Sequence, residues 1–157
     1  MRVMVRGPLG GRSGRAVLAG FYAYLLLHAA TGAILFLTKL GWTPASVARY
    51  YRGDPERFLN PRSFQGLLEV THFHLFAFGF FYVVVAHLLL HARLPRAVRT
   101  ALLSGLGLAL TADLAAGWLV RYLHPGFAWL KLGGFWAMEA STVVSLLVLT
   151  GALFRKG

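Results

Sequence analysis

The sequence predicts an all-α membrane protein with a single domain, built as an up-and-down bundle of four transmembrane helices. Of its 157 residues 57% are hydrophobic and only 13% are charged, whereas about a quarter of the residues of a soluble domain carry charge. Four apolar runs each reach the roughly 20 residues that a helix needs to cross the hydrocarbon of a bilayer. The last three runs are joined by short connections, which makes neighbouring helices antiparallel.

The first span is predicted at residues 15–39, around the apolar stretch AVLAGFYAYLLLHAATGAILFLT. A basic segment precedes it, so a cleaved signal peptide is the alternative interpretation. The apolar part is longer than the core of a signal peptide, which has about 7–15 residues. We therefore expect a retained span, followed by spans at residues 66–91, 97–122 and 127–154.

The loop at residues 40–65 carries three helix-start signatures, in which a capping residue precedes a proline: Thr43-Pro44, Asp54-Pro55 and Asn60-Pro61. Proline is favoured at the first helical position, directly after such a cap. The pairs predict two short helices and then the start of the second span. The first short helix combines tyrosines with arginines and is either a lid over the outer end of the bundle or an anchor at the membrane interface.

The positions of the sixteen basic residues predict the orientation. Nine flank the side that holds both termini and the connection at residues 92–96: Arg2, Arg6, Arg12, Arg15, Arg93, Arg96, Arg99, Arg155 and Lys156. Seven lie toward the other side, where Asp54, Glu56 and Glu69 partly offset them. Because basic residues favour the cytoplasmic side, we expect both termini in the cytoplasm and the protein in the bacterial cytoplasmic membrane.

The net charge of +11 and the absence of cysteine limit the possible functions. The basic residues are dispersed at the ends of the spans, where contact with anionic lipid head groups explains them better than nucleic acid does. Without cysteine the chain holds no disulfide, no thiolate-ligated iron–sulfur cluster and no thioether-linked haem.

Ionisable side chains are expected at membrane depth, most visibly in the stretch EVTHFHLF of the second span. Such side chains are costly in lipid and are tolerated when they pair with one another or bind something. Helical rise and hydropathy bring six of them toward the outer half of the bundle: His28, Glu69, His72, His74, Asp113 and Glu139.

One interpretation of this cluster is a b-type haem. A haem of this kind needs two axial imidazoles at matched depth on separate helices, and His28 with His72 or His74 meets that condition to within roughly one helical turn. The phenylalanines of FHLFAFGFFY supply apolar ring surface for it. At the inner end no other span offers a histidine opposite His87 and His91, which we expect to be interfacial anchors.

The competing interpretation is a non-haem metal or a proton relay. Glu69-x-x-His72 projects a carboxylate and an imidazole from one helical face, as in carboxylate-bridged metal sites of helical bundles. Together with His74, Asp113 and Glu139, and also His28, this pair offers nitrogen and oxygen ligands suited to iron, zinc or copper. A transported ion or a chain of proton-accepting groups uses the same residue types.

The stretch LLEVTHFHLFAFG, with a profile of four spans, resembles small uncharacterised bacterial membrane proteins that carry a Thr-His-x-His element at the head of a span. The chain is also loosely similar to four-helix membrane cytochromes b, although its third and fourth spans contain no histidine. The second resemblance implies an electron-transfer subunit rather than an independent enzyme. We expect it to link a periplasmic partner to the quinone pool or to a larger complex; the alternatives are metal-ion or proton handling, or a non-catalytic accessory subunit.

Overall fold

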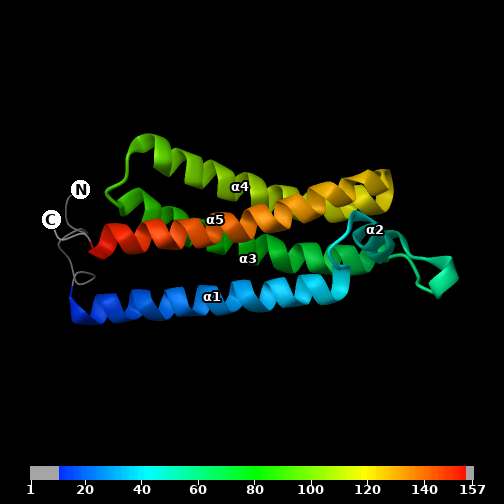
Figure 1. Cartoon of the computed structure of the whole chain (residues 1–157), viewed down its shortest axis with the longest axis horizontal. Helices are drawn as coiled ribbons and strands as arrows, with labels where there is room; N and C mark the ends of the chain where they lie inside the picture. Colours follow the sequence, from blue (N-terminus) through cyan, green and yellow to red (C-terminus); the bar gives the residue numbers. More distant parts are fainter. Residues whose placement is uncertain (1–10, 155–157) are drawn as a thin grey trace. The chain divides into compact units, whose positions relative to one another are not determined.

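A computed structural model describes residues 11–154, and nearly all of them are helical (Figure 1). Four helices are long and apolar enough to cross a membrane: α1 (Arg12–Leu40), α3 (Phe64–His91), α4 (Arg96–Trp118) and α5 (Ala128–Phe154). Residues 11–154 contain no β-strand apart from one isolated bridge between Asp54 and Leu59. The predicted class, an all-α protein with four spans, is confirmed. Four of the basic residues used to predict the orientation lie outside the described part of the chain: Arg2, Arg6, Arg155 and Lys156.

The chain divides after Leu35 into two compact units. The first consists, in its described part, of α1 up to that residue and includes His28. The second begins at Phe36 and holds the end of α1 and all that follows. The candidate site described below belongs entirely to the second unit.

Within the second unit, α4 and α5 form a closely packed antiparallel hairpin, and α3 packs on α4 (Figure 1). The closest approach is at Gly134 of α5, where a Cβ atom would lie 2.8 Å from the backbone nitrogen of Asp113. Gly107 of α4 similarly faces Tyr82 of α3, since its Cβ would lie 3.3 Å from that ring. Small residues thus allow these helices to approach each other closely in an apolar environment.

The turn between α4 and α5 departs from the α-helical pattern. A π-helical turn, η3 (Leu119–Leu123), is followed by a 3-10 turn, η4 (Pro125–Phe127), and the amide of His124 donates to the carbonyl of Leu119 over 3.0 Å. In an α-helix the amide of His124 would instead donate to the carbonyl of Val120. Pro125, the residue after His124, cannot replace it because proline has no N–H. The Val120 carbonyl instead accepts from Nη1 of Arg52 over 3.2 Å.

The loop before α3 follows two of its three predicted helix starts. Thr43 caps α2 (Pro44–Arg52) with a reciprocal capping box, and Asp54 caps a single 3-10 turn, η2 (Pro55–Arg57). The predicted start at Asn60-Pro61 is wrong, because α3 begins three residues later with Ser63 as its cap. Backbone groups of Arg62 bond elsewhere, its amide to the Tyr51 carbonyl (3.0 Å) and its carbonyl to Nε of Arg121 (2.8 Å).

Helix α2 packs against α5 and against the two turns that join α4 to α5. It buries Val47 and Tyr51 there. These contacts favour the interpretation that α2 is a lid on the end of the α4–α5 hairpin. They do not favour a helix that only anchors the membrane interface.

Candidate functional site

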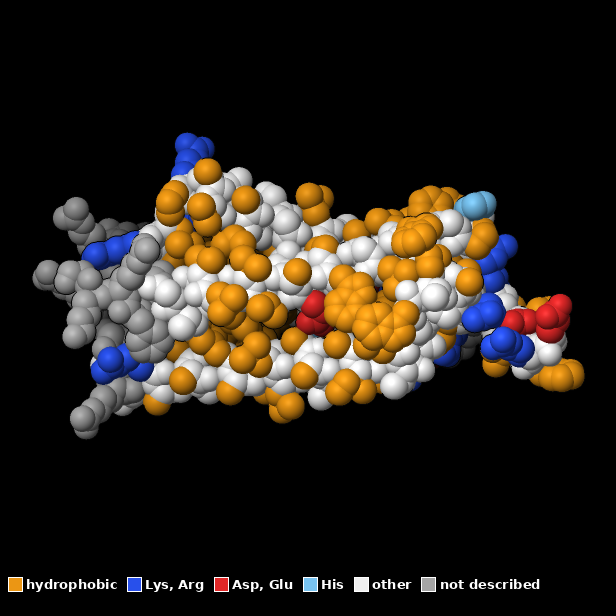
Figure 2. All heavy atoms as spheres, viewed as in Figure 1, with side chains coloured by type: hydrophobic (Ala, Val, Ile, Leu, Met, Phe, Trp, Pro, Cys, Tyr) orange, Lys and Arg blue, Asp and Glu red, His pale blue; other side chains and the backbone are white. Residues whose placement is uncertain are grey.

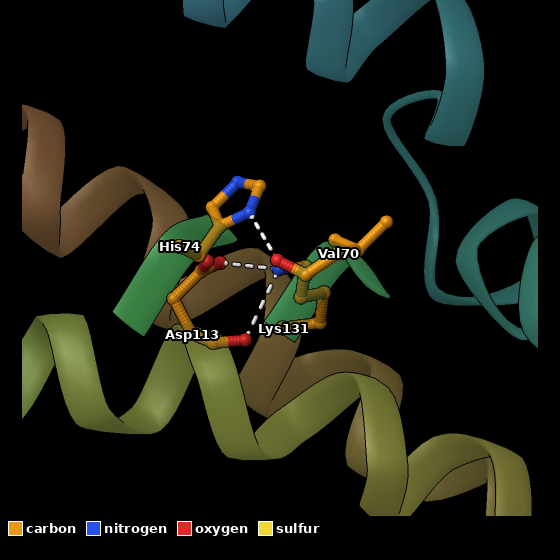
Figure 3. Close-up of polar contacts among 4 residues, drawn as sticks. All are labelled: Val70, His74, Asp113 and Lys131. Carbon is orange, nitrogen blue, oxygen red and sulfur yellow. Dashed lines mark hydrogen bonds and ion pairs between the residues drawn. The ribbon is translucent and has the colours of Figure 1, made fainter. Parts of the chain in front are cut away.

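An ion pair between Asp113 of α4 and Lys131 of α5 is the most buried charged feature of the described residues (Figure 3). The Nζ atom of Lys131 lies 2.7 Å from Oδ1 of Asp113, and the two side chains are only 13% and 6% exposed. Nζ also donates to the backbone carbonyl of Asp113 over 3.1 Å. Its approach to Oδ1 is poorly directed for a hydrogen bond, so the carboxylate is held mainly by charge.

Two glycines make room for this pair. Gly134 lies about one helical turn beyond Lys131, and its missing side chain lets the backbone of α5 touch that of α4 beside Asp113. Gly117 lies one turn beyond Asp113 on α4 and faces the ring of Tyr51, since a Cβ there would be 3.1 Å from Cε1 and 3.2 Å from the hydroxyl. The hairpin thus brings the two charges together, and the lid helix places a phenol next to them.

Tyr51 keeps its proton in this environment. Burial raises the pKa of its phenol well above the usual range, and the negative charge of Asp113 raises it further. Tyr50 acts in the same direction, whereas the positive charge of Arg62 lowers the pKa of Tyr51. The lid therefore presents a neutral hydroxyl-bearing ring toward the buried ion pair, without adding a third charge.

The ionisable residues of EVTHFHLF, which are Glu69, His72 and His74, lie on α3 and are exposed. Glu69 accepts a hydrogen bond from Nε2 of Gln65 over 3.1 Å. Thr71, which lies between Glu69 and His72, faces α4, because its hydroxyl accepts a hydrogen bond from Nε1 of Trp118 over 2.8 Å. Successive helical residues turn by about 100°, so His72 points about 100° away from Thr71, and His74 points about 60° away from it in the opposite sense.

The imidazole of His74 has a defined tautomer (Figure 3). Its Nδ1 lies 2.7 Å from the carbonyl oxygen of Val70, and because a carbonyl only accepts, Nδ1 is the donor. The lone pair of the neutral ring is then on Nε2, as in histidines whose metal-binding nitrogen is oriented by a backbone carbonyl. His91, at the other end of α3, makes the same contact with the carbonyl of His87, also over 2.7 Å.

The predicted metal ligands do not gather around one point in the part of the chain that the structure describes. No group of three or more histidine and acidic side chains there has an arrangement that could hold a metal ion. Asp113 pairs with Lys131, while Glu139 is half-buried on α5. His28 lies on α1 in the first unit, so its pairing with His72 or His74 stays a prediction.

Sequence reasoning missed Lys131 and Tyr51 as members of the site. One signal was available for Lys131. It and Asp113 carry opposite charges on either side of a short turn, and their distances along the chain from that turn differ by only about one helical turn. A lysine side chain is long enough to span such a difference, and in lipid an unpaired charge is costly. No comparable signal exists for Tyr51, whose position depends on how α2 packs.

Comparison with known proteins identifies one family. Its sequence model matches residues 41–157, and it is described as a transmembrane helical domain. The matched region contains α2 to α5 and thus the ion pair, the lid helix and the histidines of α3. No curated protein and no solved structure matches the chain.

Proposed function

The chain belongs to the Aq_1264_TM family of transmembrane helical domains, and we propose, on the geometry around His74, that it acts within the membrane as an electron-transfer subunit that holds one b-type haem beside α3. The observation that carries this proposal is the exposed imidazole of His74, whose Nδ1–H is bound to the Val70 carbonyl, so that the lone pair of the neutral ring is on Nε2 and is available to bind a metal. An exposed polar ring within a span is costly unless a bound group or a partner covers it.

The neighbourhood of His74 suits the edge of a porphyrin. The ring of Phe78 stands edge-on to the imidazole with 5.1 Å between centroids. Phe73, Phe76 and Phe80 are exposed on the same helix, and apolar rings of this kind favour contact with a large planar group. We propose that His74, or alternatively His72 on the same helix, would hold the haem iron together with His28. When bound, haem iron would supply reversible one-electron transfer.

The proposed setting is the bacterial cytoplasmic membrane, with both termini in the cytoplasm and the α2 lid on the periplasmic side. The distribution of basic residues supports this orientation. The subunit would then accept electrons at its outer end from a periplasmic partner and pass them to the quinone pool or to a larger membrane complex, or carry them in the reverse direction.

Absorption spectroscopy of the purified full-length chain tests the proposal. We expect a Soret band that shifts on reduction, and we expect His74→Ala to remove it. His91→Ala is the matched control, because His91 makes the same backbone contact at the other end of α3 and should leave the spectrum unchanged. Chain that stays colourless after expression with added haem precursor, or equal loss in both variants, would contradict the proposal; if His72→Ala alone removes the band, the ligand is His72.

A second candidate function, proton handling, is favoured by the ion pair of Asp113 and Lys131. A buried ionisable pair within a span is typical of proton relays. In liposomes that contain a pH-sensitive dye and a potassium diffusion potential, this function predicts a proton flux that the double variant Asp113→Asn/Lys131→Met abolishes. A colourless chain that holds stoichiometric iron, copper or zinc would instead favour the metal-ion interpretation, and an inactive chain without metal an accessory subunit.

A further inference from the structure

A cavity of about 410 Å³ opens where α2 meets the end of α1 and the loop before α3. All of its lining residues lie between positions 37 and 62, within the second unit. Its polar lining comes from three segments: Thr38 and Lys39 at the end of α1, Ser46 and Arg49 on α2, and Asn60 and Arg62 in the loop. The cavity lies at the ends of the spans, where a membrane's phosphate groups are found.

Positive charge dominates this cavity. Lys39, Arg49 and Arg62 line it, and no aspartate or glutamate does. Both salt bridges found among residues 11–154 use other cations, Arg57 and Lys131. Figure 2 shows the Lys and Arg side chains that gather near the lid helix. Three cations converging on one cavity repel each other unless an anion lies between them.

The walls of the cavity are fixed before any ligand arrives. Arg62 is held at its backbone by Tyr51 and Arg121, and its guanidinium lies 4.1 Å from the centre of the Tyr50 ring. Asp54 and Leu59 exchange two backbone hydrogen bonds of 2.9 Å, which closes the loop below Asn60. Because Arg62 is already oriented, it loses little conformational entropy when the site binds a ligand.

We propose that this cavity binds a phosphate-bearing anion, supplied either by the head group of an anionic phospholipid or by a small soluble phosphate compound. Arginine recognises phosphate through paired N–H donors, and lysine adds a point charge. The volume lies within the range of small-molecule sites, about 300–1,000 Å³. The cavity thus has room for a phosphate group together with the glycerol or a similar polar group attached to it.

Two binding measurements on the full-length chain in zwitterionic detergent test this site. Native mass spectrometry records how much phosphatidylglycerol is retained compared with phosphatidylcholine, and calorimetry records binding of glycerol 3-phosphate and of inorganic phosphate. We expect Arg49→Gln to weaken binding of the preferred ligand about tenfold, because it removes charge-assisted hydrogen bonds. The matched control is Arg57→Gln, which removes the same charge from the same loop region but outside the cavity, and should change binding less than about twofold at an ionic strength that screens surface charge.

The outcomes separate the possible ligands. Selective retention of phosphatidylglycerol identifies a lipid site, and binding of the soluble phosphates without lipid selectivity identifies a site for a soluble anion. Equal weakening by Arg49→Gln and Arg57→Gln, or no binding of any of these probes, would overturn the proposal. If Arg49→Gln fails to fold by circular dichroism, Lys39→Gln takes its place, since Lys39 is an exposed residue of the same lining.

Discussion

Replacing Lys131 with methionine is expected to destabilise the protein by about 3–5 kcal/mol, because it leaves a buried carboxylate without its countercharge. Methionine preserves most of the length and apolar contact of the lysine stem, so the change isolates the charge. The carboxyl side chain of Asp113 is only 6% exposed and cannot reach water without moving α4.

The size of this effect can be checked within the same chain. The double variant Asp113→Asn/Lys131→Met removes both charges and is expected to lie within about 1–2 kcal/mol of the natural protein, because replacing a whole buried pair is often neutral. Arg57→Met is the exposed control. Arg57 lies 3.6 Å from Asp54 but is 65% exposed, and such pairs contribute about 0–1 kcal/mol.

Equilibrium unfolding in mixed micelles at pH 7, followed by tryptophan fluorescence and circular dichroism, measures these free energies. We expect a large cost for Lys131→Met and near recovery of stability in the double variant. If Lys131→Met costs no more than Arg57→Met at pH 7, the ion pair is not shielded from water, and its interpretation as a buried site at membrane depth fails.

Three further predictions concern the contacts around the pair. Gly134→Ala should destabilise by about 1–3 kcal/mol, because its Cβ would press on the backbone of α4, whereas the adjacent Gly133→Ala, with open space around it, should be neutral or stabilising by up to about 1 kcal/mol in the same unfolding assay. Stability should fall above pH 10 by up to about 1.4 kcal/mol per pH unit, because the raised pKa of buried Tyr51 keeps its proton in the folded state while the unfolded chain loses it; a pH series in which Tyr51→Phe declines as steeply as the natural protein would refute this. Thr71→Val should cost about 1 kcal/mol, because Trp118 loses its hydrogen-bond acceptor. A red-shifted tryptophan emission in this variant would show that the bond has been lost, and an unchanged emission would show that it does not exist in solution.

Much of the fold could be predicted because single-residue properties determine it. Length and hydropathy alone locate a helix that must cross lipid, so the predicted second span at 66–91 differs from α3 (Phe64–His91) only by two residues at its start. Thr43 was also predicted correctly as a helix cap, since a capping residue and the proline after it determine the helix start within a single turn. The predicted cap at Asn60 was wrong, because the backbone of Arg62 in the following segment is hydrogen-bonded to Tyr51 and Arg121, which lie elsewhere in the sequence.

The site was harder to predict because it depends on which helical faces meet. Depth estimates grouped Asp113 with the histidines of α3, yet depth says nothing of rotation about the helix axis. The hydrogen bond from Trp118 to Thr71 turns α3 so that Thr71 faces α4, and the close approach at Gly134 turns Asp113 toward Lys131. Both contacts join spans, and neither partner can be recognised from its own segment.

The turn that contains Pro125 provides the backbone acceptor that holds the lid helix near the ion pair. Because Pro125 has no N–H and the amide of His124 bonds to Leu119, the carbonyl of Val120 has no backbone donor, and Arg52 at the end of α2 supplies one. The adjacent residue, Tyr51, is thereby held against Gly117, one turn from Asp113. A ligand that draws on the cations of the neighbouring cavity would act on the same short helix, since Arg49 and Arg52 are both part of α2. The lid helix is therefore the element through which the proposed binding in this cavity would change the surroundings of the buried charges.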